Sequence, residues 1–176
     1  MGRNVILAPH NPDWIAQYET EAARLTAVFQ PILVASYHIG STAIPNIKAK
    51  PIIDILLVVR EITAVNSFIP AMAELGYISK GENGIPGRHY FRRGSDEHHT
   101  HHLHVYAQTH PEIARHLNFR DYLCTHPPEA AAYSQLKERL AQQFFADPAT
   151  YTESKTAFIQ TIDQKALQWR QTQAVS

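Results

Sequence analysis

The feature that most constrains the fold is the apolar run from Ile52 to Val59, with the sequence IIDILLVV. Apolar residues occupy both odd and even positions of this run. A strand formed here would therefore be buried on both faces, as central strands of a sheet are. The run is much shorter than a membrane span and has Asp54 near its middle. It predicts a central strand in a protein that does not cross a membrane.

The other segments follow from hydrophobic periodicity and from the positions of proline and glycine. Asn11-Pro12-Asp13 marks the start of an N-terminal amphipathic helix that runs towards Pro31. Further strands are expected at 33–39, 77–79, 89–92 and 103–107, and further helices at 63–75, 111–125, 129–145 and 151–169.

This order of elements predicts an α/β (α+β) fold. A mixed β-sheet of about five strands would be combined with the N-terminal helix and with a C-terminal helical layer of about three helices. The chain has 176 residues, of which 44% are hydrophobic, which is enough for one sizeable core. We therefore expect a single domain over residues 1–176.

The charge balance and the cysteine count limit the classes of function. The 16 Lys and Arg residues equal the 16 Asp and Glu residues, so there is no bulk positive field to attract nucleic acid. The single cysteine, Cys124, excludes an intramolecular disulfide and suits a reducing compartment. The N-terminal residues do not resemble a signal peptide. We expect a cytoplasmic protein whose partner is neither nucleic acid nor a membrane.

Asp54 is the first candidate site residue. An ionised carboxylate within an apolar strand is costly to bury unless a positive group compensates for it. The structural alternative is a carboxylate that caps a loop or pairs with Lys50 or an arginine. Gly40, Ser41 and Thr42 open the loop before this strand, and a Gly-Ser turn can hold a phosphate. A hard cation could bridge such a phosphate to Asp54.

A second group of candidates is the histidine-rich segment 98–104, which holds five of the eleven histidines. In a strand, alternation places His102 and His104 on one face and the apolar residues around them on the other. If this strand lies beside the one that carries Asp54, the three residues could form a metal site with open positions. The other three histidines are expected to form a solvated turn: His98, His99 and His101.

Residues 38–59, HIGSTAIPNIKAKPIIDILLVV, resemble the signature of the GrpB family. Further matching motifs follow in the same order: GIPGRHYF at 84–91, HLHVY at 102–106, HLNFRDYL at 116–123 and YTESKTAFI at 151–159. The resemblance covers nearly the whole chain. The GrpB family is similar to nucleotidyltransferases of the polymerase-β type, and in some bacteria a GrpB domain is fused to dephospho-coenzyme A kinase.

The resemblance implies a nucleotidyltransferase-like sheet with Gly40 and Ser41 in the phosphate-binding turn and Asp54 as the metal carboxylate. Thr42, Lys50 and Arg88 lie in the matching motifs, and we assign them to phosphate binding as well. The chain departs from the usual pattern at one position. Active nucleotidyltransferases place two carboxylates two residues apart on one strand face, whereas the second position here is Leu56.

The leading hypothesis is a nucleotidyltransferase-like protein that binds a nucleotide or another phosphorylated small molecule with Mg²⁺ or Mn²⁺. Asp54 would hold the metal, and His104 would be a second ligand or a base. The first alternative is a metal-dependent phosphohydrolase that uses Asp54, His102 and His104 with an ion such as Zn²⁺. The second alternative is a non-catalytic ligand-binding or regulatory module linked to coenzyme A metabolism.

Overall fold

A computed structural model describes residues 3–175. The elements up to the fifth strand are α1 (Asp13–Phe29), β1 (Leu33–Ile39), the 3-10 helix η1 (Ser41–Ala43), β2 (Ile53–Val59), the 3-10 helix η2 (Ile62–Phe68), α2 (Ile69–Glu74), β3 (Tyr77–Ser79), β4 (Arg88–Gly94) and β5 (His99–Ala107). Four helices follow: α3 (Pro111–Thr125), α4 (Pro127–Gln143), α5 (Pro148–Ser154) and α6 (Thr156–Ala174). Within the described residues no helix is both long and apolar enough to cross a membrane.

The mixed α/β fold expected from the sequence is confirmed, with two differences in the helices. The helix expected at 63–75 begins as η2, and only its second half, from Ile69, is an α-helix with proline in its first turn. The helix expected at 151–169 is two helices, α5 and α6, which are separated at Lys155. The apolar spacing runs through both, so hydrophobic periodicity did not reveal the break.

The described residues divide into two compact units. The sheet unit consists of Pro12–Gly40 and Ile52–Ile113. The helical unit consists of the residues up to Asn11, the loop Ser41–Pro51 and the chain from Ala114 onwards. Helix α3 therefore begins in the sheet unit and continues in the helical unit.

The sheet unit holds one five-stranded mixed sheet in the order β1-β2-β5-β4-β3. Strands β2 and β5 are parallel, and the other neighbouring pairs are antiparallel. Six of the seven residues of β2 are buried, as expected of a central strand with apolar side chains on both faces. The sequence-based placement of this strand is therefore confirmed.

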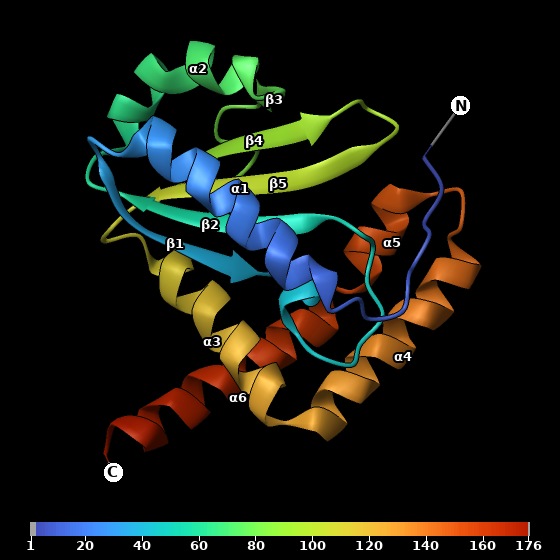
Figure 1. Cartoon of the computed structure of the whole chain (residues 1–176). Helices are drawn as coiled ribbons and strands as arrows, with labels where there is room; N and C mark the ends of the chain where they lie inside the picture. The colour runs from blue at the N-terminus through green and yellow to red at the C-terminus, as the bar shows by residue number, and fades with distance from the viewer. Residues whose placement is uncertain (1–2, 176) are drawn as a thin grey trace. The chain divides into compact units, whose positions relative to one another are not determined.

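Helix α1 covers one face of this sheet, as Figure 1 shows. Its Tyr18 hydroxyl lies 3.0 Å from the Ser36 hydroxyl, and its buried Glu21 accepts hydrogen bonds from Tyr77 at 2.8 Å and from Arg93 at 2.9 Å. Because side chains alternate along a strand, the residues next to these partners point to the opposite face. That opposite face carries Asp54.

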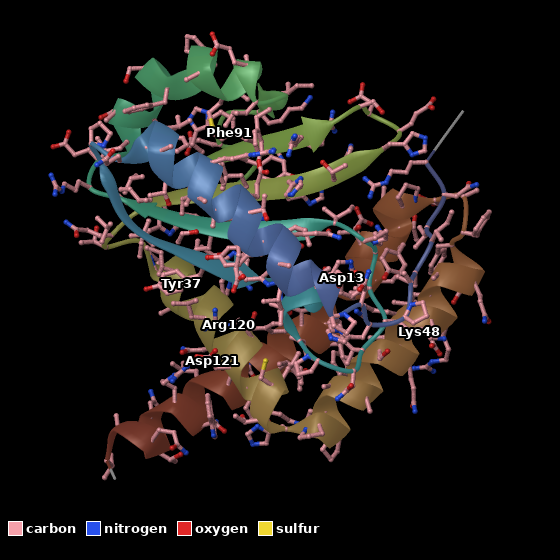
Figure 2. All side chains as sticks on the ribbon, in the orientation of Figure 1. Asp13, Tyr37, Lys48, Phe91, Arg120 and Asp121 are labelled. Carbon is pink, nitrogen blue, oxygen red and sulfur yellow. The ribbon has the colours of Figure 1, made fainter. Side chains whose placement is uncertain are left out.

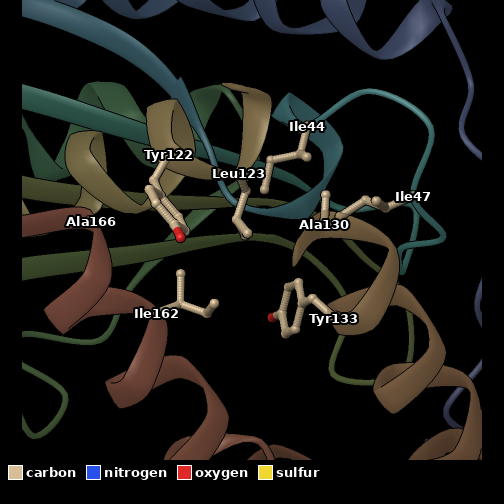
Figure 3. Close-up of a cluster of buried hydrophobic side chains, with 8 residues drawn as sticks. All are labelled: Ile44, Ile47, Tyr122, Leu123, Ala130, Tyr133, Ile162 and Ala166. Atoms are coloured by element: carbon tan, nitrogen blue, oxygen red, sulfur yellow. The ribbon is translucent and has the colours of Figure 1, made fainter. Parts of the chain in front are cut away.

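The helices of the helical unit pack around the loop Ser41–Pro51, whose first residue belongs to the turn that the sequence suggested for phosphate binding. Ile44 and Ile47 of this loop are buried in a hydrophobic cluster with residues of α3, α4 and α6 (Figure 3).

On α3, Asp121 accepts hydrogen bonds from the neighbouring Arg120 and from Arg170 of α6, and Figure 2 labels Arg120 and Asp121. These charges therefore stabilise contacts within the helical unit.

Candidate functional site

The register of the central strands brings the predicted site residues together. Asp54 on β2 is paired with His102 on β5, and Leu56, two residues further along, is paired with His104. The side chains of Asp54, His102 and His104 therefore share one face of the sheet, since positions two apart point the same way. The metal-site hypothesis requires these strands to be neighbours, and they are.

The two imidazoles converge on one carboxylate oxygen. His102 Nδ1 and His104 Nε2 each lie 3.4 Å from Asp54 Oδ1. The Asp54 side chain keeps 26% of its exposure, so the carboxylate is shielded by its neighbours but can still be reached by a ligand. A carboxylate can only accept hydrogen bonds when it is ionised, so both imidazoles direct an N–H group at it.

The other carboxylate oxygen of Asp54 lies against the backbone of Gly40. Gly40 has a φ of +73°, in the left-handed region that glycine adopts most easily. A Cβ atom at this position would lie 2.6 Å from Asp54 Oδ2, which is closer than non-bonded atoms approach. Glycine is therefore required here both for its backbone conformation and for its lack of a side chain.

The surroundings of Asp54 keep its carboxyl group ionised. Burial by itself would raise the pKa of Asp54, but hydrogen bonds from His102 and His104 and their electrostatic attraction outweigh this effect. The net result is a pKa well below the ordinary value of 3.8. Asp54 is therefore a fixed negative charge at neutral pH, able to hold a cation.

Arg88 supports this arrangement from β4. Its guanidinium donates to the backbone carbonyls of Glu82 at 3.1 Å and Asn83 at 2.7 Å, and its Nη1 lies 3.5 Å from His104 Nδ1. Arginine can only donate, so Nδ1 of His104 is the acceptor and the ring proton lies on Nε2, facing Asp54. In this structure Arg88 anchors the loop before β4 and orients His104, and its assignment to phosphate binding stays a prediction.

His99 lies beside the candidate site residues, which the sequence did not reveal. It was expected in a solvated turn, but it lies in β5, and its Nδ1 is 3.1 Å from His102 Nε2. The strand has an irregularity here, because Arg93 pairs with His101 whereas Gly94 pairs with His99, which leaves Thr100 as an extra residue. One extra residue reverses the alternation, so His99 reaches the face of His102. A bulge of this kind leaves no periodic signal.

Three further residues assigned to phosphate binding lie in the helical unit. Ser41 begins η1, and its carbonyl accepts a hydrogen bond from Ile44 N at 3.2 Å. Thr42 is buried, with 1% of its surface exposed. The ammonium group of Lys50 lies 4.5 Å from the ring centre of Tyr151. Their role in phosphate binding stays a prediction.

The donor set around Asp54 does not form a ready-made metal centre. Within residues 3–175, no group of three or more His, Cys, Asp or Glu side chains is arranged to hold a metal ion. In addition, His102 and His104 each direct an N–H group, rather than a free lone pair, at the ionised Asp54. Leu56, where a second carboxylate would be expected, is fully buried. A cation at this site would need additional oxygen ligands from a bound molecule.

The model of the GrpB protein family matches residues 4–165 of this chain. The chain belongs to the GrpB family. It is 46% identical over 168 residues to the UPF0157 protein YqkA of Bacillus subtilis, covering 96% of this chain but 49% of that protein. It is also 33% identical to the glutamate-rich protein GrpB of Alkalihalophilus pseudofirmus, covering 90% of this chain and 93% of that one. The GrpB chain therefore spans about half the length of its YqkA relative.

Solved structures confirm the fold. A crystal structure of the conserved protein GrpB from Enterococcus faecalis superimposes with a TM-score of 0.90 at 40% identity, over 94% of this chain and 99% of that one. The terminal uridylyl transferase 4 of Trypanosoma brucei, with bound dUTP, gives a TM-score of 0.51 at 12% identity, over 77% of this chain and 47% of that one. The second match shows a nucleotidyltransferase-like fold.

Proposed function

We propose that this GrpB protein binds a nucleotide or another phosphorylated small molecule together with a divalent cation at Asp54. The observation that carries this proposal is the ionised carboxylate at the centre of the sheet, with Gly40 against one oxygen and two imidazoles on the other. The uridylyl transferase with a similar fold was solved with dUTP, which supports the choice of a nucleotide. We place this function in the cytoplasm, since a single cysteine suits a reducing compartment.

The proposed cation is Mg²⁺ or Mn²⁺, because hard ions prefer oxygen ligands. Asp54 would supply one carboxylate, and the phosphate groups of the ligand would supply the other oxygens. When bound, such an ion neutralises phosphate charge. The contribution of the chain itself is to hold Asp54 ionised and in one orientation through His102 and His104.

The finer proposal is nucleotidyl transfer, with Asp54 and His104 as the catalytic residues. Two features make binding better supported than transfer. Asp54 is the only carboxylate on β2, because Leu56 occupies the second position. In addition, both ring nitrogens of His104 are engaged, one towards Asp54 and one towards Arg88. To act as a base, His104 would first have to release one of these contacts.

Calorimetric titration of nucleoside triphosphates in the presence of Mg²⁺ or Mn²⁺ tests this proposal. We expect metal-dependent binding that is lost in Asp54→Asn, since the amide has the shape of the carboxylate without its charge. The matched control is Asp13→Asn on the exposed first turn of α1, which should bind as the wild type does. No binding by the wild type, or equal binding by Asp54→Asn, would overturn the proposal.

The second candidate function is a metal-dependent phosphohydrolase. It is favoured by the two imidazoles that share one sheet face with the Asp54 carboxylate, because His and Asp donors together suit Zn²⁺ and similar ions once each ring turns a lone pair towards the ion. Phosphomonoester hydrolysis should then depend on an added transition metal and be lost in His104→Ala. A metal-stripped protein that stays inactive after Zn²⁺ or Mn²⁺ is restored would exclude this candidate.

A further inference from the structure

The sheet unit contains a cavity of about 540 Å³ between the end of α2 and strands β4 and β5. Helix α2 lies beside the edge strand β3 (Figure 1). The charged and polar side chains of the cavity are those of Glu74 on α2, Arg93 on β4, and Thr100 and His101 on β5. Arg93 points to the face opposite Asp54. A cavity of this volume is typical of small-molecule sites, and neither candidate function uses it.

Arg93 supplies the cavity with a cation that has donors left for a ligand. Its Nη1 donates to Glu21 Oε2 at 2.9 Å, and the same oxygen lies 3.5 Å from Arg24 Nη1. The buried Glu21 therefore serves two guanidinium groups, and the summed charge of the three stays positive. Within residues 3–175, Glu21 is the hydrogen-bond partner of the Arg93 guanidinium. A Cβ atom on Gly76 would lie 3.7 Å from Arg93 Nε, so the missing side chain leaves this donor uncovered.

Glu74 supplies the opposite charge. It is exposed, and within the described part of the chain its carboxylate forms no ion pair with Arg93 or with another cation. Burial lowers the pKa of His101, so its imidazole adds polarity but no charge at neutral pH. Leu75 adds an apolar contact surface. A cation and an anion that line one cavity without closing on each other leave room for a ligand that carries both charges.

We propose that this cavity binds a free α-amino acid, with the ligand carboxylate on Arg93 and the ligand ammonium group on Glu74. Arginine holds a carboxylate through two parallel N–H donors, which fixes the orientation of that end of the ligand. The ligand side chain would contact Leu75. This site shares no residue with the proposed nucleotide site and needs no metal, so either site can be refuted without the other.

Nuclear magnetic resonance of the isotope-labelled full chain, titrated with L-leucine in the presence of EDTA, tests the site. The amide signals of Gly76 and Gly94, which line the cavity, should shift saturably at millimolar ligand. The amide signal of Gly84, in the loop before β4, should stay in place. Two leucine analogues that each lack one charge, isocaproate and isoamylamine, should bind at least about tenfold more weakly than leucine.

Two variants separate the two charges. Glu74→Gln should weaken the binding of leucine and isoamylamine but not that of isocaproate. Arg93→Lys should weaken the binding of leucine and isocaproate, because lysine keeps a positive charge beside Glu21 but loses the two parallel donors. The dispersion of the amide signals reports whether each variant folds. The analogue series and Glu74→Gln decide the question even if Arg93→Lys does not fold.

The matched control is Glu61→Gln, which removes an exposed carboxylate at the start of η2 and should bind leucine as the wild type does. Three outcomes would overturn the proposal: no shift of Gly76 and Gly94 with leucine, equal binding of leucine and its two analogues, or equal losses in Glu74→Gln and Glu61→Gln.

Discussion

Replacing Lys137 by methionine should remove a pH dependence of stability that the wild type possesses. Methionine keeps the length and apolar stem of the side chain but cannot carry a charge. In the folded chain the pKa of Lys137 is about 7, compared with an ordinary value of 10.5. Between these two values the unfolded chain retains a proton that the folded chain has released. The free energy of unfolding should therefore rise with pH across this window.

The size of the effect follows from the shift in pKa. Each pKa unit corresponds to about 1.4 kcal/mol, so the burial of a protonated Lys137 costs roughly 5 kcal/mol relative to the neutral amine. The side chain is 2% exposed, so solvent screens this cost little. Between about pH 8 and about pH 9.5 the wild type should gain roughly 2 kcal/mol over the variant. This is a large fraction of the ~5–15 kcal/mol that stabilises an ordinary domain.

Urea denaturation followed by circular dichroism at several pH values from about 6 to about 9.5 measures this difference. Below about pH 7 Lys137 is protonated in both the folded and the unfolded wild type, so the full cost of burying its charge is present. The free energy of unfolding of Lys137→Met should there exceed that of the wild type by the largest amount. Lys165→Met is the control, because its exposed ammonium pairs with Glu129 at 2.6 Å. Because Lys165→Met retains Lys137, its free energy of unfolding should rise with pH as that of the wild type does.

A parallel pH dependence of the wild type and Lys137→Met would refute the reasoning. It would mean that Lys137 keeps an ordinary pKa in the folded chain. The burial of its ammonium group and the nearby charge of Lys155 would then not lower its pKa as inferred.

Two further predictions concern the sheet unit, and urea denaturation checks both. Gly40→Ala should lower the free energy of unfolding by about 1–2 kcal/mol because of its left-handed backbone, and by more because of the clash with Asp54. Gly84 has a φ of +90° and nothing within 4 Å of an added Cβ, so Gly84→Ala should lose only the backbone contribution. Glu21→Gln should lower the free energy of unfolding by roughly 2–3 kcal/mol, because it weakens the charged hydrogen bonds to the buried Tyr77 and to Arg93. Glu19→Gln, on the exposed side of α1, should change stability by less than about 0.5 kcal/mol.

Equal losses in the two glycine variants would show that Asp54 does not lie against the Gly40 backbone. Equal effects of the two glutamine variants would show that the buried carboxylate on α1 contributes no more than a solvated one.

The sequence by itself determined the central part of the sheet and the strand face on which the candidate site residues lie. The run Ile52–Val59 is apolar at both odd and even positions, and only a strand covered on both faces accommodates that pattern. Alternation then placed His102 and His104 on a common face, and the ordered motifs led to the GrpB family. These inferences held because side-chain alternation along a strand and the pattern of apolar residues are local properties of the chain.

Tertiary structure decided which distant groups meet and what they do there. The parallel pairing of β2 with β5 brings His102 and His104 to Asp54, although 50 residues separate His104 from Asp54 in the chain. An extra residue in β5 brings His99 to the same face against the alternation. Lys137 likewise donates to the backbone carbonyl of Lys48, 89 positions away in the sequence. Contacts of this kind depend on strand order, register and packing, which hydrophobic periodicity does not encode.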